Sequence, residues 1–259
     1  MNSISLFAAL LVSAALAGCV SQTSIHTQTP DDKPAKSDAT QRAQAHTGLS
    51  GAYYQRGQMA VALDEARMAL KERGDYVPAF NMLALIYMEL RDDAQATASF
   101  EQALRLSPDD SDVFNNYGWF LCQRGEPAKA MDYFKSALKN PLYTTPERAH
   151  LNAGICARKL GNEAEAERNL RLALQIQPLL GQALYEMADI SYKRVQLKDA
   201  VSFLTRYNRA TPNPTVEALL LGVRVSRALG DKSSEDSYVQ QLKRRFPEAP
   251  ETRLATENR

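Results

Sequence analysis

The sequence predicts an all-α protein, a right-handed α-solenoid built from six helix-turn-helix repeats. Two observations carry the prediction. A motif of large, small and helix-stopping residues recurs at a nearly constant period over most of the 259 residues, and runs typical of β-strands are almost missing. A single helix-turn-helix unit cannot bury its apolar face alone, so neighbouring copies have to stack against it. Stacked copies form one continuous body in which each repeat contacts its neighbours.

The clearest copy of the motif lies between Phe80 and Pro108. Its large residues fill the space beside two crossing helices, and its small residues let those helices approach closely. The large residues are Phe80, Tyr87 and Phe100, and the small ones are Ala84, Ala96 and Ala103. Pro108 lacks a backbone N–H and therefore ends the second helix. This spacing resembles the tetratricopeptide repeat, a unit of about 34 residues.

One small residue marks the same place in every copy. The six are Ala62, Ala96, Ala130, Ala166, Ala200 and Ser234, separated by 34, 34, 36, 34 and 34 residues. Within a repeat region of 41–247, the repeats are expected at about 43–76, 77–110, 111–146, 147–180, 181–214 and 215–247. The two additional residues fall in a longer turn, Asn140 to Pro146. The polar sixth repeat is expected to cap the array, and residues 248–259 are expected to form a frayed tail.

Residues 1–18 have the features of a lipoprotein signal peptide. The apolar run from Leu6 to Ala17 has 12 residues, which is too short to span a bilayer and suits a signal peptide. It leads into Leu16-Ala17-Gly18-Cys19, which resembles the bacterial lipobox. That resemblance implies cleavage before Cys19, a diacylglycerol thioether on its sulfur and an acyl chain on its new amino group. The alternative is an ordinary secretory signal in which Cys19 is incidental.

Residues 19–40 are expected to be the lipidated N-terminus and a flexible tether. From Ser21 onward the segment is polar, and Ile25 is its only large apolar residue, so it cannot bury enough surface to offset the entropy of ordering. A flexible chain of this length reaches roughly 25 Å. Val20 and Ser21 follow the cysteine, without the Asp that signals retention at the inner membrane. The expected location is therefore the periplasmic face of the outer membrane.

Charge and motifs argue against nucleic-acid binding and catalysis. The 31 Lys and Arg nearly balance the 30 Asp and Glu, for a net charge of +1, without the basic excess that a nucleic-acid binder uses to neutralise phosphates. No nucleophile motif, phosphate-binding glycine loop or metal-ligand spacing occurs. His46 and His150 stand where the repeat carries a packing residue. We expect no enzyme activity, no small-molecule substrate and no cofactor besides the lipid on Cys19.

Cys122 and Cys156 are a candidate disulfide pair. Both lie near the end of a first helix, in the third and fourth repeats, and first helices of adjacent repeats pack side by side. An oxidising compartment makes a bond feasible, provided that the two Cα atoms lie within about 7 Å. The alternative is two buried free thiols.

The first helices are expected to line a concave groove that binds a partner protein. The candidate groove residues are Asn81, Leu85, Met88, Asn115, Asn116, Trp119, Ile155, Arg158, Tyr185 and Tyr192. Apolar side chains mixed with carboxamides, which can pair with backbone N–H and C=O, suit an extended peptide. Trp119 is off the usual packing position and is a candidate anchor, or else it packs between repeats. The pattern that clamps a terminal carboxylate is not evident, because Thr47 and Gly51 stand at its first positions.

A lipobox, a polar tether, six repeats and the run from Asn115 to Cys122, NNYGWFLC, together resemble a known family. They are similar to the type IV pilus biogenesis and stability lipoproteins of the PilF/PilW group, from Cys19 to about Pro247. The resemblance implies a pilotin, a lipoprotein that helps the pilus secretin reach the outer membrane and assemble into its multimer. It also implies a secretin as the partner, and the cysteine pair resembles that of the disulfide-bearing members.

A second hypothesis keeps the fold and changes the assembly. The protein would then be an outer-membrane repeat scaffold for outer-membrane protein insertion, polysaccharide export or cell-wall synthesis. Both hypotheses describe interaction proteins, and the Asn-Asn-Tyr-Gly-Trp run favours the pilus. The segment of secretin, the face of the array, the breadth of clients and the oligomeric state stay open at the level of sequence.

Overall fold

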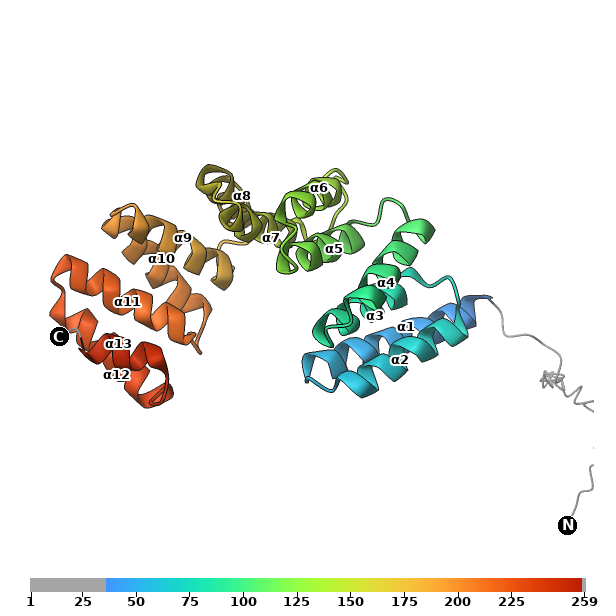
Figure 1. Cartoon of the computed structure of the whole chain (residues 1–259), viewed down its shortest axis with the longest axis horizontal. Coiled ribbons are helices and arrows are strands. Elements are labelled where there is room, and N and C mark those ends of the chain that lie inside the picture. The colour runs from blue at the N-terminus through green and yellow to red at the C-terminus, as the bar shows by residue number, and fades with distance from the viewer. Residues whose placement is uncertain (1–35, 258–259) are drawn as a thin grey trace, which may run out of the picture. The chain divides into compact units, whose positions relative to one another are not determined.

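A computed structural model describes residues 36–257, and these residues form thirteen helices and no strand (Figure 1). The all-α prediction is therefore confirmed. The predicted signal peptide, Cys19 and most of the predicted tether lie outside the described residues. The helices are α1 (Lys36–Gln55), α2 (Met59–Glu72), α3 (Val77–Glu89), α4 (Asp93–Leu106), α5 (Ser111–Gln123), α6 (Pro127–Ala137), α7 (Pro146–Lys159), α8 (Glu163–Ile176), α9 (Gly181–Lys193), α10 (Leu197–Ala210), α11 (Val216–Leu229), α12 (Lys232–Arg245) and α13 (Pro250–Glu257).

The helices pair into six repeats that follow one another along the chain (Figure 1). Each odd-numbered helix from α1 to α11 packs against the even-numbered helix that follows it. The backbones of odd-numbered helices of adjacent repeats also approach each other, whereas among the described residues successive even-numbered helices meet through side chains only. One example is the hydrogen bond of 3.0 Å from Asn208 Nδ2 of α10 to the hydroxyl of Tyr238 of α12. The repeats are thus closer together on the side of the odd-numbered helices. That side is the inner, concave face, where the sequence places the groove.

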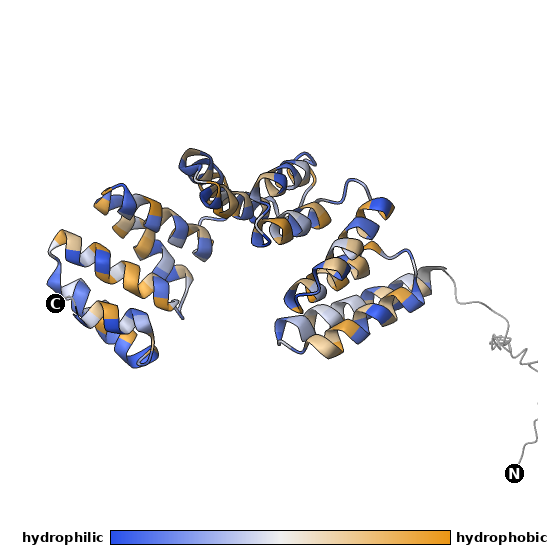
Figure 2. Cartoon of the chain, in the orientation of Figure 1, coloured by the Kyte–Doolittle hydropathy of each residue, from blue (hydrophilic) through white to orange (hydrophobic). Residues whose placement is uncertain are grey.

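Several helix starts follow directly from local sequence. Side chains of five residues accept a hydrogen bond from a backbone N–H in the first turn of α4, α5, α8, α11 or α12; these residues are Asp92, Asp110, Asn162, Thr215 and Asp231. Such caps satisfy donors that have no partner inside the helix. Most of the helices then turn an apolar stripe toward their neighbours, so orange and blue alternate along their ribbons in Figure 2.

Small residues set how closely the two helices of a repeat approach. The marker alanines of the first five repeats, at positions 62, 96, 130, 166 and 200, are all 0% exposed. Glycines on the facing helix have the same role. A Cβ added at Gly118 would lie 2.8 Å from Cε1 of Phe134, so even alanine would push α5 and α6 apart. Tight packing at these crossings explains why the marker residue keeps its register.

Turns between the two helices of a repeat need a left-handed residue. Four of them use glycine, with φ between +71° and +85° at Gly57, Gly125, Gly161 and Gly230. The second and fifth repeats instead place Arg91 at φ +62° and Val195 at φ +60°. A left-handed conformation is strained for any residue with a Cβ and most of all for a β-branched one.

The first helix begins earlier than the sequence indicated. α1 starts at Lys36, inside the segment predicted as tether. Polar contacts with α2 and the residue after it hold α1 in place: Arg73 Nη1 donates to Thr40 Oγ1 at 2.9 Å, and Arg42 Nε pairs with Glu72 at 2.6 Å. These contacts join residues about thirty positions apart, so the polar composition of the segment alone did not reveal them.

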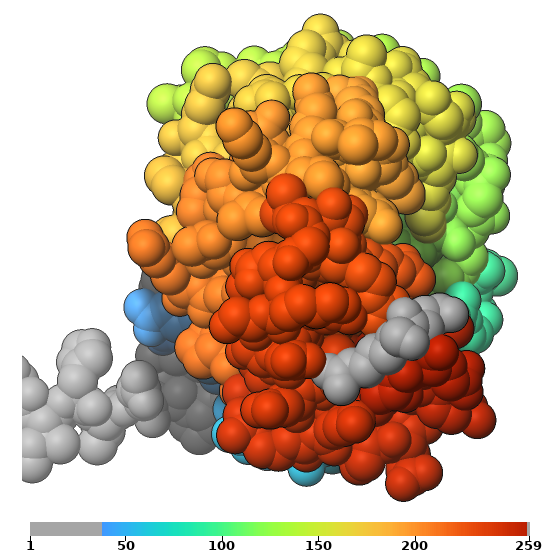
Figure 3. All heavy atoms as spheres, turned by 90° about the vertical axis from the view of Figure 1, so that its left-hand side faces the viewer, coloured from blue at the N-terminus to red at the C-terminus, as the bar shows by residue number. Residues whose placement is uncertain are grey.

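The prediction of a frayed tail is wrong. Residues 250–257 form α13, which packs against α11 and α12 at the C-terminal end of the array (Figure 3). Ala255 is 1% exposed, and its carbonyl accepts a hydrogen bond from Arg227 Nη2 at 3.0 Å. Thr252 Oγ1 donates to the carbonyl of Phe246 at 2.6 Å. α13 therefore lies against α11 as the first helix of a further repeat would, and the sixth repeat is not the last element.

Candidate protein-binding groove

All ten predicted groove residues lie on odd-numbered helices, and they differ in exposure. They come from α3, α5, α7 and α9, the helices that contact each other along the inner face. Eight of them are partly exposed. Met88 and Asn115 are only 8% and 3% exposed, so these two are wrong as free surface. Both are covered because neighbouring first helices pack closely there, and they belong to the inter-repeat contacts beneath the groove.

Four asparagines form a hydrogen-bonded row across α3, α5 and α7, which we name the amide ladder: Asn81, Asn116, Asn115 and Asn152. Asn152 Nδ2 donates to Asn115 Oδ1 at 2.9 Å, Asn115 Nδ2 to Asn116 Oδ1 at 3.2 Å, and Asn116 Nδ2 to Asn81 Oδ1 at 3.2 Å. Every donor points the same way, so the row is polar along its length. Each carboxamide has two N–H donors, and the ladder uses one from each of three.

The repeat pattern of the sequence indicated three of these asparagines and passed over Asn152. A signal for it was present, because Asn152 is the second residue after His150, as Asn116 is after Phe114. Both reach back to the preceding repeat, to Asn115 and Asn81 respectively. The same place in two consecutive repeats thus carries the same contact.

Apolar side chains flank the ladder on the inner face. Leu85 and Trp119 are partly exposed and pack against a buried cluster that includes Met88 and Cys122. Trp119 therefore does both things that the sequence suggested: it packs at the joint between repeats and keeps part of its ring at the surface. Ile155 on α7 is also partly exposed. The middle of the groove is uncharged, with amides beside aliphatic and aromatic surface.

The joint between the third and fourth repeats contains a disulfide. Cys122 on α5 and Cys156 on α7 are bonded, with their Cα atoms 5.9 Å apart. Lys159 adds a hydrogen bond from Nζ to the carbonyl of Cys122 at 3.3 Å. This is the pairing that the sequence made feasible. It fixes the two helices that carry Trp119 and Ile155 relative to each other.

The joint between the fourth and fifth repeats contains a buried ion cluster. Arg158 pairs with Glu186 and Asp189, and Lys193 Nζ lies 2.8 Å from Asp189. The Arg158, Glu186 and Asp189 side chains are 16%, 11% and 17% exposed. Burial opposes ionisation of Asp189, but hydrogen bonds from Lys193 and Arg158 outweigh it and lower its pKa. Arg158 was expected to face a ligand, and the structure uses it to join two repeats.

The tyrosines at the far end of the groove lie beside this cluster. Burial raises the pKa of Tyr185 to about 12, and the nearby carboxylates of Asp189 and Glu186 add to the effect. Its hydroxyl therefore stays protonated and can donate a hydrogen bond. Tyr192 is partly exposed one helical turn past Asp189 and faces α11.

The two histidines outside the N-terminal segment make contacts within their own repeats. His46 Nδ1 lies 2.7 Å from Glu65 Oε2, and His150 Nδ1 lies 3.1 Å from Asn169 Oδ1. Within residues 36–257 no group of three or more His, Cys, Asp or Glu side chains could hold a metal ion. Across the same residues, no helix is both long and apolar enough to pass through a membrane.

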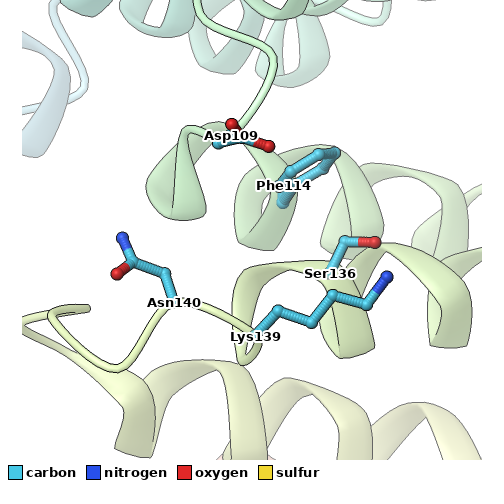
Figure 4. A pocket seen from close by; sticks show the side chains of 5 residues that line it. All are labelled: Asp109, Phe114, Ser136, Lys139 and Asn140. Atoms are coloured by element: carbon cyan, nitrogen blue, oxygen red, sulfur yellow. The ribbon is translucent and has the colours of Figure 1, made fainter.

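A separate hollow lies at the edge of the third repeat (Figure 4). It has a volume of about 300 Å³ and is lined by Phe114 and Ser136, with Asp109 on one side and Lys139 and Asn140 on the other (Figure 4). The longer turn starts beside it, where Asn140 Oδ1 accepts from the N–H of Leu142 at 2.9 Å. None of these residues was among those predicted for the groove.

The fold and groove define the class of protein. Two family models, both described as tetratricopeptide repeat, match residues 81–145 and 147–178. Tetratricopeptide-repeat arrays are protein-binding scaffolds and not an enzyme family. The repeat class predicted from the 34-residue spacing is thereby confirmed.

Similar proteins define the family within that class. The crystal structure of PilW, described as a widely conserved type IV pilus biogenesis factor, is 35% identical, with a TM-score of 0.73 over 82% of this chain and 97% of that one. The curated type IV pilus assembly protein PilF of Pseudomonas aeruginosa is 26% identical over 92% of each chain. The structure of Pseudomonas aeruginosa PilF has the same fold, with a TM-score of 0.77 at 24% identity over 86% of this chain and 100% of that one. The chain belongs to the PilF/PilW group of type IV pilus biogenesis proteins.

Proposed function

We propose that this protein is an outer-membrane lipoprotein that acts as a pilotin in type IV pilus biogenesis. Its groove binds a segment of the pilus secretin, and the complex brings the secretin to the outer membrane and promotes its assembly into the multimer. Membership of the PilF/PilW group supports the pathway. The lipobox at Leu16 to Cys19 supports the anchor and the periplasmic face of the outer membrane.

The observation that carries the proposal is the amide ladder beside Leu85, Trp119 and Ile155. An extended peptide has one N–H and one C=O per residue to satisfy, and partly exposed carboxamides offer partners for both. The aliphatic and aromatic surface beside them receives its side chains. The disulfide and the ion cluster hold the first helices of the third, fourth and fifth repeats in fixed positions. A preformed groove loses less entropy on binding than a flexible one.

The mechanism is physical and involves no chemical step. A lipid on Cys19 holds the protein at the membrane, and the groove holds the secretin segment. Tethering converts the search of secretin subunits for one another into an encounter at high local concentration. A single acyl chain gives only reversible membrane binding, whereas several chains hold a protein stably. A triacylated cysteine would therefore anchor the protein stably at the membrane.

The first test is the heat- and detergent-resistant secretin multimer in outer-membrane fractions. We expect it to be lost in a strain that lacks this gene, and reduced or misplaced in a strain that carries Cys19→Ala. Replacing Trp119 by Ala in the purified soluble chain should weaken binding of the secretin's periplasmic region at least tenfold. Normal multimers in both strains would refute the pilotin function and favour a scaffold for another envelope assembly.

A further inference from the structure

One position of the repeat is filled by a buried apolar side chain in four successive repeats. The residues are Ile86, Phe120, Cys156 and Ile190, and they are 0%, 3%, 0% and 1% exposed. Each faces the repeat before it. Cys156 is bonded to Cys122 of the preceding repeat, and Ile86 packs in a cluster with Ala62 and Ala66 of the first repeat. The position therefore closes the joint between neighbouring repeats.

In the sixth repeat the same position is Arg224, which follows Ile190 by the repeat length of 34 residues. Arg224 is exposed, and a pocket of about 330 Å³ opens beside it. Val223 and Leu220, only 0% and 8% exposed, contribute its apolar lining, with Tyr192 of α9 on one side. The buried apolar side chain of the earlier repeats is here replaced by an exposed cation beside a pocket, while Leu221 and Val225 pack the rest of the joint.

The last helix completes this pocket. Leu254 of α13 is 47% exposed and lines it, so an apolar side chain stays at the surface here. Arg227, the second arginine in the lining, is already engaged with the carboxylate of the buried Glu235 at 2.9 Å and with the carbonyl of Ala255 at 3.0 Å. Arg224 has no such partner among the described residues. The pocket thus offers one available guanidinium above an apolar floor.

This inference rests on the proposed function and names the chemistry of the partner. We propose that the Arg224 pocket receives the side chain of an Asp or Glu in the bound segment, next to a large aliphatic side chain that packs on Leu220 and Leu254. A guanidinium binds a carboxylate through two parallel N–H···O bonds, and the apolar lining suits the neighbouring side chain. The pocket continues the groove, because Tyr192 belongs to both.

Three substitutions separate binding from folding. Arg224→Gln removes the charge, Arg224→Lys keeps it without the forked geometry, and Arg224→Ile installs the residue of the fifth repeat. We expect Arg224→Ile to melt at the wild-type temperature or higher, because it can close the joint as Ile190 does, and yet to bind the partner at least tenfold more weakly. The affinity of Arg224→Gln for the partner should fall by a similar factor, and that of Arg224→Lys should fall by less.

The partner's acid is identified by a double-mutant cycle. Overlapping peptides that cover the secretin's periplasmic region are titrated against the mature chain by fluorescence anisotropy. Each Asp or Glu of a bound peptide is then changed to Asn or Gln. One such change should weaken binding to the wild type about tenfold and have no further effect on Arg224→Gln. The inference would be overturned if the losses of affinity from the two changes add, or if Arg224→Gln binds as tightly as the wild type. It would also be overturned if only amidation of the peptide's C-terminus weakens binding.

The control is Trp119→Ala, at the centre of the groove and away from Arg224. If this change weakens binding and the Arg224 changes do not, the groove function stands and the Arg224 inference fails. If no secretin peptide binds the wild type, the proposed function fails first. The pocket is then tested with acetyl-Leu-Asp-Leu-amide and its Asn counterpart, by the shift of the Arg224 Nε–H resonance, assigned by its loss in Arg224→Lys. A shift with both peptides or with neither would refute the pocket.

Discussion

The joint between the third and fourth repeats and the joint between the fourth and fifth each bring two first helices together, and they do so with different chemistry. The first is held by the Cys122–Cys156 disulfide, and the second by Arg158 between Glu186 and Asp189. The disulfide stabilises mainly by restricting the unfolded chain. The ion cluster acts in the folded state, where its attraction has to outweigh the cost of removing three charges from water. One face of a solenoid can thus be held rigid by two unrelated mechanisms.

The largest expected effect is at the ion cluster. Arg158→Ala leaves the buried Glu186 without its cation and Asp189 with Lys193 alone, so it should lower the free energy of unfolding by about 3–5 kcal/mol. Urea unfolding followed by circular dichroism measures the change. Lys193 pairs with the same Asp189, but its side chain is 60% exposed. Lys193→Ala is therefore the matched control, with an expected loss within about 1 kcal/mol. Equal losses for the two variants would mean that Arg158 is not a buried charge in solution.

The disulfide should contribute slightly less than Arg158 to the free energy of unfolding. Its bond spans a sequence separation of 34 residues, for which the loop-entropy model gives about 3–4 kcal/mol. Cys122→Ser with Cys156→Ser should show that loss in urea unfolding, and dithiothreitol should produce the same loss in the wild type. The reductant should leave the double variant unchanged. If dithiothreitol did not lower the free energy of unfolding of Arg158→Ala, the two joints would not be independent.

The two joints also differ in how visible they are in the sequence. Two cysteines at matching places of adjacent repeats indicate each other as partners, so the pairing of Cys122 with Cys156 is a natural prediction from the repeat pattern. Arg158 could not be assigned, because its repeat position points to the groove and its two carboxylate partners come from the next repeat. The same reason explains the early start of α1 and the existence of α13. Both depend on arginine contacts, from Arg73 and Arg227, that bridge distant segments.

The sequence predicts well those features that recur in every repeat because the same packing contact recurs. Small residues at helix crossings recur because backbones must approach there, and helix starts at Val77, Ser111 and Gly181 coincide with predicted repeat boundaries. The face of the groove and the exposure of eight of its ten residues were predicted, and that of Met88 and Asn115 was not. Met88 and Asn115 lie on that face but are covered by the neighbouring first helices. Their exposure depends on the distance between first helices of adjacent repeats, and the sequence of a single repeat does not determine that distance. The sequence assigns Arg224 to the polar cap formed by the sixth repeat, and the pocket beside it could not be predicted because Leu254 of α13 completes its lining.

Acid should weaken one joint and spare the other. The pKa of Asp189 is lowered in the folded protein by Lys193 and Arg158, so Asp189 contributes stability above its unfolded pKa of about 3.9. That stability is lost as the pH falls through the lower folded pKa. Between pH 5 and pH 2 the wild type should lose more stability than Asp189→Asn, which has no carboxylate to protonate there. Parallel pH profiles for the two proteins would show that Asp189 has no lowered pKa, and the disulfide variant should keep the wild-type slope.

The smallest effect should be a gain in stability, at the turn between α9 and α10 in the fifth repeat. Val195 holds φ +60° where the turn after α7 has Gly161 at φ +72°. The Val195 side chain is 76% exposed, so little burial offsets the strain of a β-branched residue in the left-handed region, which is of order 1–3 kcal/mol. Glycine relieves that strain but adds freedom to the unfolded chain, so Val195→Gly should raise the free energy of unfolding by about 1 kcal/mol. Gly161→Val is the reciprocal change and should lower it by a similar amount. If Val195→Gly destabilises the protein while Gly161→Val does too, the valine side chain makes contacts that its exposure does not reveal, and the turn is held by more than its backbone.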